Sequence, residues 1–468
     1  MVVISADMCC TSLAVAFLGS QGSHFGLDDL AKGERSEPFV IYPPPLSLPT
    51  KRFTPSWLAG SQNIRHLHFA CVLCYNGSMN TTSCIITNAQ AVTAGGTISN
   101  ATIVVEHGRI ANISAERVDV PPDAQHLDAR GNLVLPGFID LHIHGGRGFD
   151  VMDGTVAAVH GLAAHLATHG VTGFLATTVT ASLDDTIAAA QVVRQVRALP
   201  SPGAAILGMH LEGPYINVAR RGAQNPAHIR PPSIAELGRV IAASGQCVRL
   251  VTLAPEIAGA HEMAAYLRQN GIVASMGHSD ATYEQALAAL DAGFSHVTHT
   301  YNAMRPFQHR DPSIVSVALT DARCMAELIA DGLHVHPGAA RVLIQARGAQ
   351  GVVLVSDAMR GASLPYGCYR TGGQDIWTSQ NGARTADGHL AGSLLTLGVA
   401  LRNVISWTGL PLPTALAMSS LNQARELGLD ARKGSLEPGK DADLAICSPT
   451  FDALAMIVGG RIVHNKLG

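Results

Sequence analysis

The segment GFIDLHIHGG, residues 137–146, joins an apolar, strand-like run to two histidines, His142 and His144. Side chains two residues apart lie on the same face of a β-strand, so both imidazoles share a face with Asp140, whereas apolar side chains cover the opposite face. Imidazole pairs with this spacing are able to bind Zn²⁺, Fe²⁺ and other divalent first-row metals. The segment therefore predicts a strand with one face in the core and the other at a chemical site.

Further metal-binding residue types occur where other strand-like runs end. They are Glu212 after AILGMHL, His278 after IVASMG, His299 after HVT, and Asp357 in VVLVSDA. Histidine and carboxylate ligands without cysteine are typical of open catalytic metal sites, in which the metal lowers the pKa of water to about 7 and polarises a carbonyl. A single histidine at a strand end is more often structural, so the inference of a hydrolytic metal site depends on the joint pattern.

Other histidines have simpler interpretations. His210 shares a strand face with Glu212 but lies two residues deeper, so we expect it beside the metal ligands rather than among them. His296 is three residues from His299 and therefore faces the opposite side of its strand. A further group lies on a helical stretch and is expected at the surface: His160, His165 and His169.

Eight strand-like segments alternate with helical segments in the central part of the chain. The strands are predicted at 138–144, 173–179, 205–212, 248–254, 272–278, 296–299, 325–331 and 352–358, with helical stretches such as 184–199, 260–270 and 282–293 between them. This order predicts an α/β protein with a parallel (β/α)₈ barrel of the TIM type, whose strands all end at one rim. A doubly wound open sheet is the alternative, but no glycine-rich phosphate motif follows the first strand.

Short strands and turns occupy both ends of the predicted folded region, residues 81–136 and 433–468. Each end contains a Gly-Arg-Ile hairpin, and the two have the same style of sequence. We therefore expect the two ends to form one small β-sandwich domain beside a catalytic barrel of residues 137–432.

Residues 1–80 contain the proline-rich stretch IYPPPLSLPTKRFTPSW and have neither strand nor helix periodicity, so we expect them to be a disordered extension. A signal peptide is not expected, because no Lys or Arg precedes Lys32. Cys71 and Cys74 form a lone CxxC that we interpret as incidental. Met79 comes just before the first orderly strand pattern, and our hypothesis is that synthesis of the natural protein begins there.

The composition excludes several classes of partner. The 468 residues include 47% apolar but only 14% charged side chains, with a formal charge of −3 and no basic block, so neither nucleic acid nor an anionic membrane is an expected partner. No segment has the roughly 18 apolar residues of a membrane span. Only four of the nine cysteines lie beyond residue 84, and they are widely scattered, which indicates a reduced cytoplasmic protein.

Several longer motifs resemble a known family. LPGFIDLHIHG (135–145), together with the ligand pattern, resembles the amidohydrolase superfamily. Six further motifs resemble the N-acetylglucosamine-6-phosphate deacetylase family: HLEGPYIN (210–217), MGHSDAT (276–282), THTYNAM (298–304), ADGLHV (330–335), VSDAM (355–359) and GSLEPGKDADL (434–444). The resemblance covers roughly residues 82–468 and implies metal-dependent removal of the N-acetyl group from an amino-sugar phosphate.

The resemblance also implies a metal-binding and catalytic set. Glu212, His278 and His299 would hold one divalent ion, His142 and His144 a second, and Asp357 would transfer protons. Zinc or iron fits these ligands, and relatives that lack the histidine pair use one ion instead of two. In this family the aspartate takes a proton from the attacking water and delivers it to the leaving amine.

Substrate-binding residues follow from the same resemblance. Asn302 and the backbone of Ala303 would contact the sugar phosphate, Arg310 would reach it across the interface of a homodimer, and His334 would bind the substrate. An arginine fork and amide donors suit a phosphate dianion. Gln224 stands where some family members carry a histidine that polarises the acetyl carbonyl; glutamine donates the same hydrogen bond but carries no charge.

Three alternatives stay open. Another amidohydrolase, such as a cyclic-amide hydrolase, would commonly carry a lysine at the end of the fourth strand, and VRLVTLAPE (248–256) has none. A non-catalytic scaffold would be expected to lack ligands, and none is missing. The sequence does not separate N-acetylglucosamine 6-phosphate from its galactosamine epimer, whose difference is the orientation of one hydroxyl.

Overall fold

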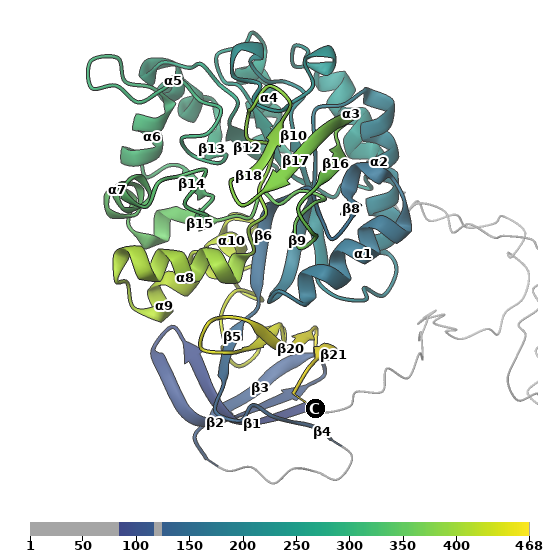
Figure 1. Cartoon of the computed structure of the whole chain (residues 1–468), viewed down its shortest axis with the longest axis vertical. Helices are drawn as coiled ribbons and strands as arrows, with labels where there is room; N and C mark the ends of the chain where they lie inside the picture. Colours follow the sequence, from purple (N-terminus) through teal and green to yellow (C-terminus); the bar gives the residue numbers. More distant parts are fainter. Residues whose placement is uncertain (1–83, 117–123, 468) are drawn as a thin grey trace, which may run out of the picture. The chain divides into compact units, whose positions relative to one another are not determined.

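Two sheets of eight strands each organise residues 84–116 and 124–467, the part of the chain that this computed structural model describes (Figure 1). The described residues lie in one compact unit. The predictions made for residues 1–80, including the Met79 hypothesis, lie outside the described residues. Within the described ranges, no helix combines the length and apolar composition that a membrane crossing requires.

The first sheet is the parallel barrel that the sequence predicts. Its strands are β6 (Phe138–Ile143), β9 (Val171–Thr178), β10 (Ala205–Glu212), β11 (Val248–Leu253), β12 (Val273–Met276), β13 (Phe294–Val297), β14 (Met325–Leu328) and β15 (Val352–Leu354), paired in sequence order. A parallel bridge between Ile143 and Ala358, and a 2.8 Å bond from the Asp357 N–H to the His142 carbonyl, join the last strand to the first. All eight predicted strands are confirmed, and their carboxyl ends meet at one rim.

Helices cover the outside of the barrel (Figure 1). They are α1 (Val156–Ala167), α2 (Leu183–Arg197), α3 (Ile234–Ala243), α4 (Ala260–Gln269), α5 (Tyr283–Ala292), α6 (Ile314–Thr320), α7 (Pro337–Arg347) and α8 (Leu397–Thr408), followed by α9 (Leu412–Ala417) and α10 (Leu421–Glu426). Local signals start several of them: Ser182 accepts from the Asp185 N–H at the start of α2, and Thr282 forms a capping box with Gln285 at α5. Their apolar faces bury the outward side chains of the strands in one core.

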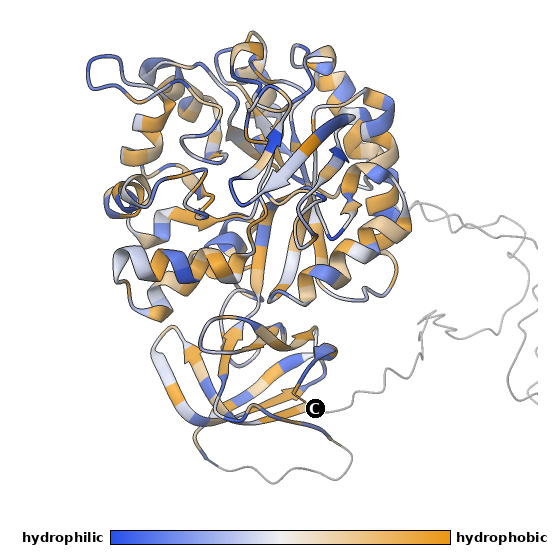
Figure 2. Cartoon of the chain, viewed as in Figure 1, coloured by the Kyte–Doolittle hydropathy of each residue, from blue (hydrophilic) through white to orange (hydrophobic). Residues whose placement is uncertain are grey.

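The second sheet combines both ends of the described chain. Its strands are β1 (Cys84–Thr93), β2 (Gly96–Glu106), β3 (Arg109–Ser114), β4 (Gln125–Asp128), β5 (Leu133–Pro136), β19 (Leu444–Cys447), β20 (Ala453–Val458) and β21 (Arg461–Asn465). They form one hydrogen-bonded sheet, in which β5 pairs with both β1 and β19. Apolar and polar residues alternate along its strands (Figure 2), and Ile86, Ile103 and Ile457 share a fully buried cluster. We propose that residues 81–136 and 433–468 form this β domain and that residues 137–432 form the catalytic barrel.

A three-stranded insertion between β15 and α8 was not predicted. It consists of β16 (Cys368–Thr371), β17 (Gln374–Ser379) and β18 (Gly382–Thr385), paired antiparallel in that order. Ile376 is buried with Met359, Ala383 and Ala391 in a small separate cluster. The Gln374 amide donates to the Ala223 carbonyl at 2.6 Å, which ties the insertion to a loop at the rim of the barrel.

The prediction that the α1 histidines lie at the surface is wrong for His165. Its ring is buried and lies against Gly146, where a Cβ atom would come within 2.8 Å of the ring. The imidazole thus fills space that the glycine leaves free after β6. His160 and His169 are half-buried, and the His169 ring packs edge-on against that of His165.

Candidate metal centre

Strand ends of the barrel bring the predicted ligands together. His142 lies in β6, His144 directly follows this strand, and Glu212 ends β10. His278 lies two residues after β12, His299 lies two residues after β13, and Asp357 follows β15. All six side chains are buried. Residues from five strands, separated by more than two hundred positions in the sequence, therefore converge at one rim, as the barrel topology requires.

Three of these ligands form a compact triangle. The Glu212 Oε1 lies 3.1 Å from both His278 Nε2 and His299 Nε2, and the two nitrogens are also 3.1 Å apart. Ligands placed tetrahedrally at 2.0–2.1 Å from a zinc ion would be about 3.3 Å apart. The size of the triangle and its nitrogen and oxygen donors therefore fit one divalent cation.

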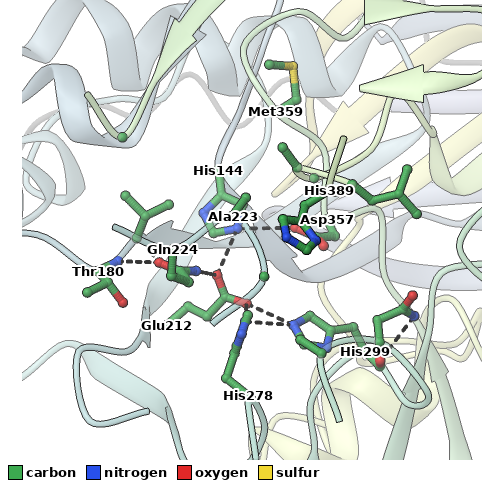
Figure 3. A pocket seen from close by; sticks show the side chains of 18 of the residues that line it. His144, Thr180, Glu212, Ala223, Gln224, His278, His299, Asp357, Met359 and His389 are labelled. Carbon is green, nitrogen blue, oxygen red and sulfur yellow. Dashed lines mark hydrogen bonds and ion pairs between the residues drawn. The ribbon is translucent and has the colours of Figure 1, made fainter. Parts of the chain in front are cut away.

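A second group adjoins the first. His142 Nε2 and His144 Nε2 are 3.3 Å apart, and the Asp357 Oδ1 lies 3.6 Å and 3.2 Å from them. Each carboxylate oxygen of Glu212 lies 3.3 Å from one of these nitrogens. Glu212 thus stands between the two groups, as Figure 3 shows with His144 and Asp357 on one side of it and His278 on the other. Such an arrangement fits two ions with a shared carboxylate.

The outer ring nitrogens orient the imidazoles. His278 Nδ1 lies 3.0 Å from the Arg220 carbonyl, and His144 Nδ1 lies 3.3 Å from that of Thr177. A carbonyl only accepts, so each Nδ1 carries the proton and each Nε2 presents its lone pair to the shared site. The hydrogen bonds therefore select the tautomer that a metal ligand needs.

Backbone strain is concentrated at the same residues. His278, His299 and Asp357 have φ values of 48°, 30° and 48°, in the left-handed region that residues other than glycine rarely adopt. Each such residue costs about 1–3 kcal/mol and persists only when its surroundings hold it. The turns at the strand ends point His278 and His299 at Glu212, and Asp357 at the two imidazoles of β6, so the strain is a cost of assembling the site.

Mutual charge sets the protonation of the site. Burial would raise the pKa of Glu212, but the charge of His142 and hydrogen bonds from the surrounding imidazoles hold it well below its usual value. Burial likewise opposes the shift at Asp357, whose pKa is lowered by His142 and His144. Burial would lower the pKa of His144, but Asp357 and Glu212 raise it to about 9, so a cation that binds there displaces the proton from Nε2. Both carboxylates therefore stay ionised, which suits a cation site.

Five of the six predicted ligands line a pocket of about 380 Å³. Nine residues predicted from the sequence line it: His144, Glu212, Gln224, His278, His299, Asn302, Ala303, His334 and Asp357. The insertion supplies a further wall through Thr371, Gly372 and Gln374. A pocket of this size suits a single phosphorylated sugar.

Gln224 is engaged in two hydrogen bonds inside the pocket. Its amide nitrogen donates to the Glu212 Oε2 at 2.5 Å, and its oxygen accepts from the Thr180 N–H at 2.7 Å (Figure 3). One of the two amide hydrogens thus restrains the carboxylate between the two ligand groups. The other is left for the predicted contact with an acetyl carbonyl.

The remaining predicted substrate residues differ in position. Asn302 donates to the His299 carbonyl at 3.2 Å, and Ala303 beside it has a φ of 49°. His334 Nδ1 lies 2.7 Å from the Asp331 carboxylate, which orients the ring. Arg310 is exposed in the loop between β13 and α6 and does not line the pocket of its own chain. Its action across a dimer stays a prediction.

Two histidines are placed as expected outside the ligand groups. The His210 nitrogens lie 3.2 Å from the Leu141 carbonyl and 2.8 Å from the Thr252 hydroxyl, so both are occupied although the ring packs against His142. His296 does not line the pocket; its ring nitrogens contact Glu327 and Glu426. Because Glu327 also contacts His142, the His296 ring points towards the centre and not to the opposite side of the strand as expected.

Sequence reasoning missed two acidic residues that hold this site. Glu327 on β14 lies 3.0 Å from His142 Nδ1, and Asp331 orients His334. Both occur in the apolar run MAELIAD, where a carboxylate must find partners if the run is buried. Two carboxylates in an otherwise apolar run were therefore the sequence signal that could have identified these residues.

Comparisons with known proteins agree with this geometry. A model of the Amidohydrolase family matches residues 133–463. N-acetylglucosamine-6-phosphate deacetylase of Bacillus subtilis (strain 168) is 37% identical over 383 residues, which are 81% of this chain and 97% of the relative. N-acetylgalactosamine-6-phosphate deacetylase of Escherichia coli O157:H7 is 40% identical over 373 residues, with coverage of 80% and 97%.

A solved structure is similar over the same region. It is that of a mutant N-acetyl-D-glucosamine-6-phosphate deacetylase from Mycobacterium smegmatis in complex with N-acetyl-D-glucosamine-6-phosphate. Its TM-score is 0.75 at 35% identity, and the match covers 82% of this chain and 99% of that one.

Proposed function

Because the chain belongs to the amidohydrolase family, we propose that it hydrolyses the N-acetyl group of N-acetylglucosamine 6-phosphate, producing glucosamine 6-phosphate and acetate. It is a hydrolase of amino-sugar catabolism. The observation that carries this function is the convergence of the Glu212, His278 and His299 triangle with Asp357 in a pocket of sugar size.

The ligand groups support one or two divalent ions per chain. Glu212, His278 and His299 would hold the first, and His142 with His144 the second. Their nitrogen and oxygen donors favour zinc or iron(II). When bound, such an ion polarises the acetamide carbonyl and lowers the pKa of a water molecule.

Asp357 would be the proton carrier. Its carboxylate is ionised and reaches the pocket, so it is able to take a proton from the attacking water as the new C–O bond forms. It then gives this proton to the amine nitrogen as the C–N bond breaks. The acetyl group leaves as acetic acid with the oxygen and the second hydrogen of the water. Acetic acid loses this proton in solution, where the neutral amine of the sugar takes up a proton.

Other residues would bind and orient the substrate. Asn302 and the Ala303 backbone would hold the phosphate at one side of the pocket, and His334, fixed by Asp331, would contact the sugar. Gln224 lies beside Glu212, where its free amide hydrogen would donate to the acetyl oxygen. The bonds that already hold these side chains reduce the entropy lost when substrate binds.

We also propose a homodimer and a cytoplasmic location. The exposed position of Arg310 supports a role in the pocket of a second copy, since it does not line the pocket of its own chain. The five described cysteines form no disulfide and four of them are buried, which supports a reducing compartment, as does a phosphorylated substrate.

The second candidate is the galactosamine epimer, which is favoured by the name of the E. coli relative. Acetate release should be measured with the zinc-loaded full chain on both 6-phosphates and on unphosphorylated N-acetylglucosamine. We expect kcat/KM for the gluco 6-phosphate to exceed that for the galacto epimer by about 10-fold or more, and that for the unphosphorylated sugar by about 100-fold or more, from lost hydrogen bonds and phosphate contacts. Faster turnover of the galacto epimer would establish the second candidate, and no acetate from either phosphate would refute both.

A further inference from the structure

Four side chains in contact with one another connect the candidate ligand His142 to helix α10. His142 Nδ1 lies 3.0 Å from the Glu327 Oε2, and the Glu327 Oε1 lies 3.1 Å from His296 Nε2. His296 Nδ1 lies 3.0 Å from the Glu426 Oε1 on α10. His142, Glu327 and His296 are fully buried, whereas the Glu426 side chain is 12% exposed.

The buried charge of Glu327 is balanced by the imidazoles of His142 and His296. In the described ranges its ion-pair partners are His142 and His296, and no Lys or Arg is among them. A buried carboxylate is stable only when its oxygens are paired and hydrogen-bonded, and both oxygens of Glu327 are. Its side chain is therefore held in one orientation from both ends.

This carboxylate selects the tautomer of His142. An ionised carboxylate only accepts hydrogen bonds, so His142 Nδ1 carries the proton, and the Nε2 lone pair is free to bind a cation between His144, Asp357 and Glu212. His144 and His278 have neutral carbonyls in the same position. A carboxylate raises the basicity of an imidazole more than a carbonyl does, so His142 is the most strongly supported ligand of the set.

The same oxygen also reaches the other ligand group. The Glu327 Oε2 accepts from the His299 N–H at 2.8 Å, at the point where the backbone adopts a φ of 30°. One carboxylate oxygen therefore holds a ring of the second group and the strained backbone of the first. The His299 side chain, however, is placed mainly by its contacts with Glu212 and His278.

We propose that Glu327 is a positioning residue that sets the metal affinity of the position formed by His142, His144 and Asp357, with a smaller effect on the position formed by Glu212, His278 and His299. This inference rests on the metal-dependent function proposed above. Metal binding is nevertheless measured without substrate, so a failure of the deacetylase assignment would leave its test intact.

The test is a zinc titration of the metal-free full chain, with bound zinc determined by elemental analysis after equilibrium dialysis. We expect two ions per wild-type chain. Glu327→Met keeps the length of the side chain but removes both acceptors, so the position formed by His142, His144 and Asp357 should lose about 100-fold in affinity. Glu327→Gln keeps an acceptor without the charge, so the same position should lose about 10-fold. The position formed by Glu212, His278 and His299 should change by less than either factor.

Glu426→Met is the matched control, because Glu426 contacts His296 but neither ligand group, and its affinities should stay within about 3-fold of wild type. If Glu327→Met does not fold, Glu327→Gln decides the matter alone. Wild-type chains that take up one ion only, Glu327→Gln with unchanged affinities, or an equal loss in Glu426→Met would each overturn the proposal.

Discussion

At the scale of single residues, Asp357 differs from the other carboxylate of the centre. Glu212 contacts four imidazoles and belongs to the ligand triangle, whereas Asp357 lies outside the triangle and faces the pocket. The first carboxylate is thus saturated by ligand contacts, and the second has an oxygen left for a water or an amine. This difference separates metal binding from proton transfer.

Asp357→Asn tests that separation. The amide has the same shape but takes up no proton, so kcat should fall by about 10²- to 10⁴-fold. Zinc at the Glu212, His278 and His299 position should be unchanged, as measured by elemental analysis of the same sample. Asp375→Asn, an exposed aspartate on β17, is the control and should keep the wild-type rate. A near-normal kcat in Asp357→Asn would rule out its role.

The ligands could be predicted because each ends a strand, and strand ends of a barrel share a rim. Glu327 could not be found in the same way, because its function lies in contacts with His142 and His296 that no spacing in the sequence reveals. His165 was misplaced for a related reason. Its burial depends on the missing side chain of Gly146, a residue on another element.

At the scale of elements, the burial of His165 in α1 predicts a pH effect on stability. Burial lowers the pKa of this ring to about 4, below the 6.5 of an exposed histidine. The unfolded chain therefore binds the proton first as the pH falls, so the stabilisation is complete above about pH 6.5 and is lost towards pH 4, by at most about 3 kcal/mol.

We expect His165→Leu to lose less thermal stability than wild type between pH 7 and pH 5, because leucine has no proton to bind. Scanning calorimetry at both pH values measures the difference. His261→Leu on α4, whose ring is only half-buried, is the control and should follow the wild-type pH dependence. Equal pH dependence in His165→Leu and wild type would contradict the expectation.

The insertion β16–β18 gives a second expectation at this scale. Ile376 anchors it in the cluster with Met359, and Ile376 itself lines the pocket together with Thr371 and Gln374. Ile376→Ala leaves a cavity that costs about 2–5 kcal/mol where the cluster does not collapse, so the wall should loosen and KM should rise about 5- to 10-fold. Zinc content should not change.

Trp377 is the matched control for this variant. It adjoins Ile376 but points to the opposite face of β17 and is 47% exposed, so Trp377→Ala should keep the wild-type KM. Steady-state kinetics of the two variants separates them. An unchanged KM in Ile376→Ala would show that the insertion is not a wall of the functional site.

The insertion was missed because its strands, CYRT, QDIWTS and GART, are short and mostly polar. One face packs only a four-residue cluster and the other meets solvent, so no apolar run marks it. The barrel strands are the opposite case. Strands such as β6 and β9 are buried at every position. Continuous burial of this kind selects largely apolar residues, so the strands are recognisable in the sequence.

At the scale of the whole molecule, the β domain shows how far topology follows from sequence. Similar hairpins at the two ends predicted one sheet, and β5 does join β1 to β19. What a single sequence does not contain is the arrangement of a second copy. The position of Arg310 makes that arrangement important, because this arginine is exposed and does not line the pocket of its own chain.

Complementation between two inactive variants would show in which chain Arg310 acts. Arg310→Ala and Asp357→Asn should each be nearly inactive as homodimers. In a heterodimer of the two, one pocket has both its own Asp357 and the arginine of the partner chain, so about half of the wild-type activity per dimer should return. Co-expression with two different tags and sequential affinity purification yields the heterodimer. If Arg310 served its own pocket, neither site in the heterodimer would be complete and no activity would return.

A heterodimer of Arg310→Ala with wild type controls for the assay, since it too should retain about half of the activity through its one complete pocket.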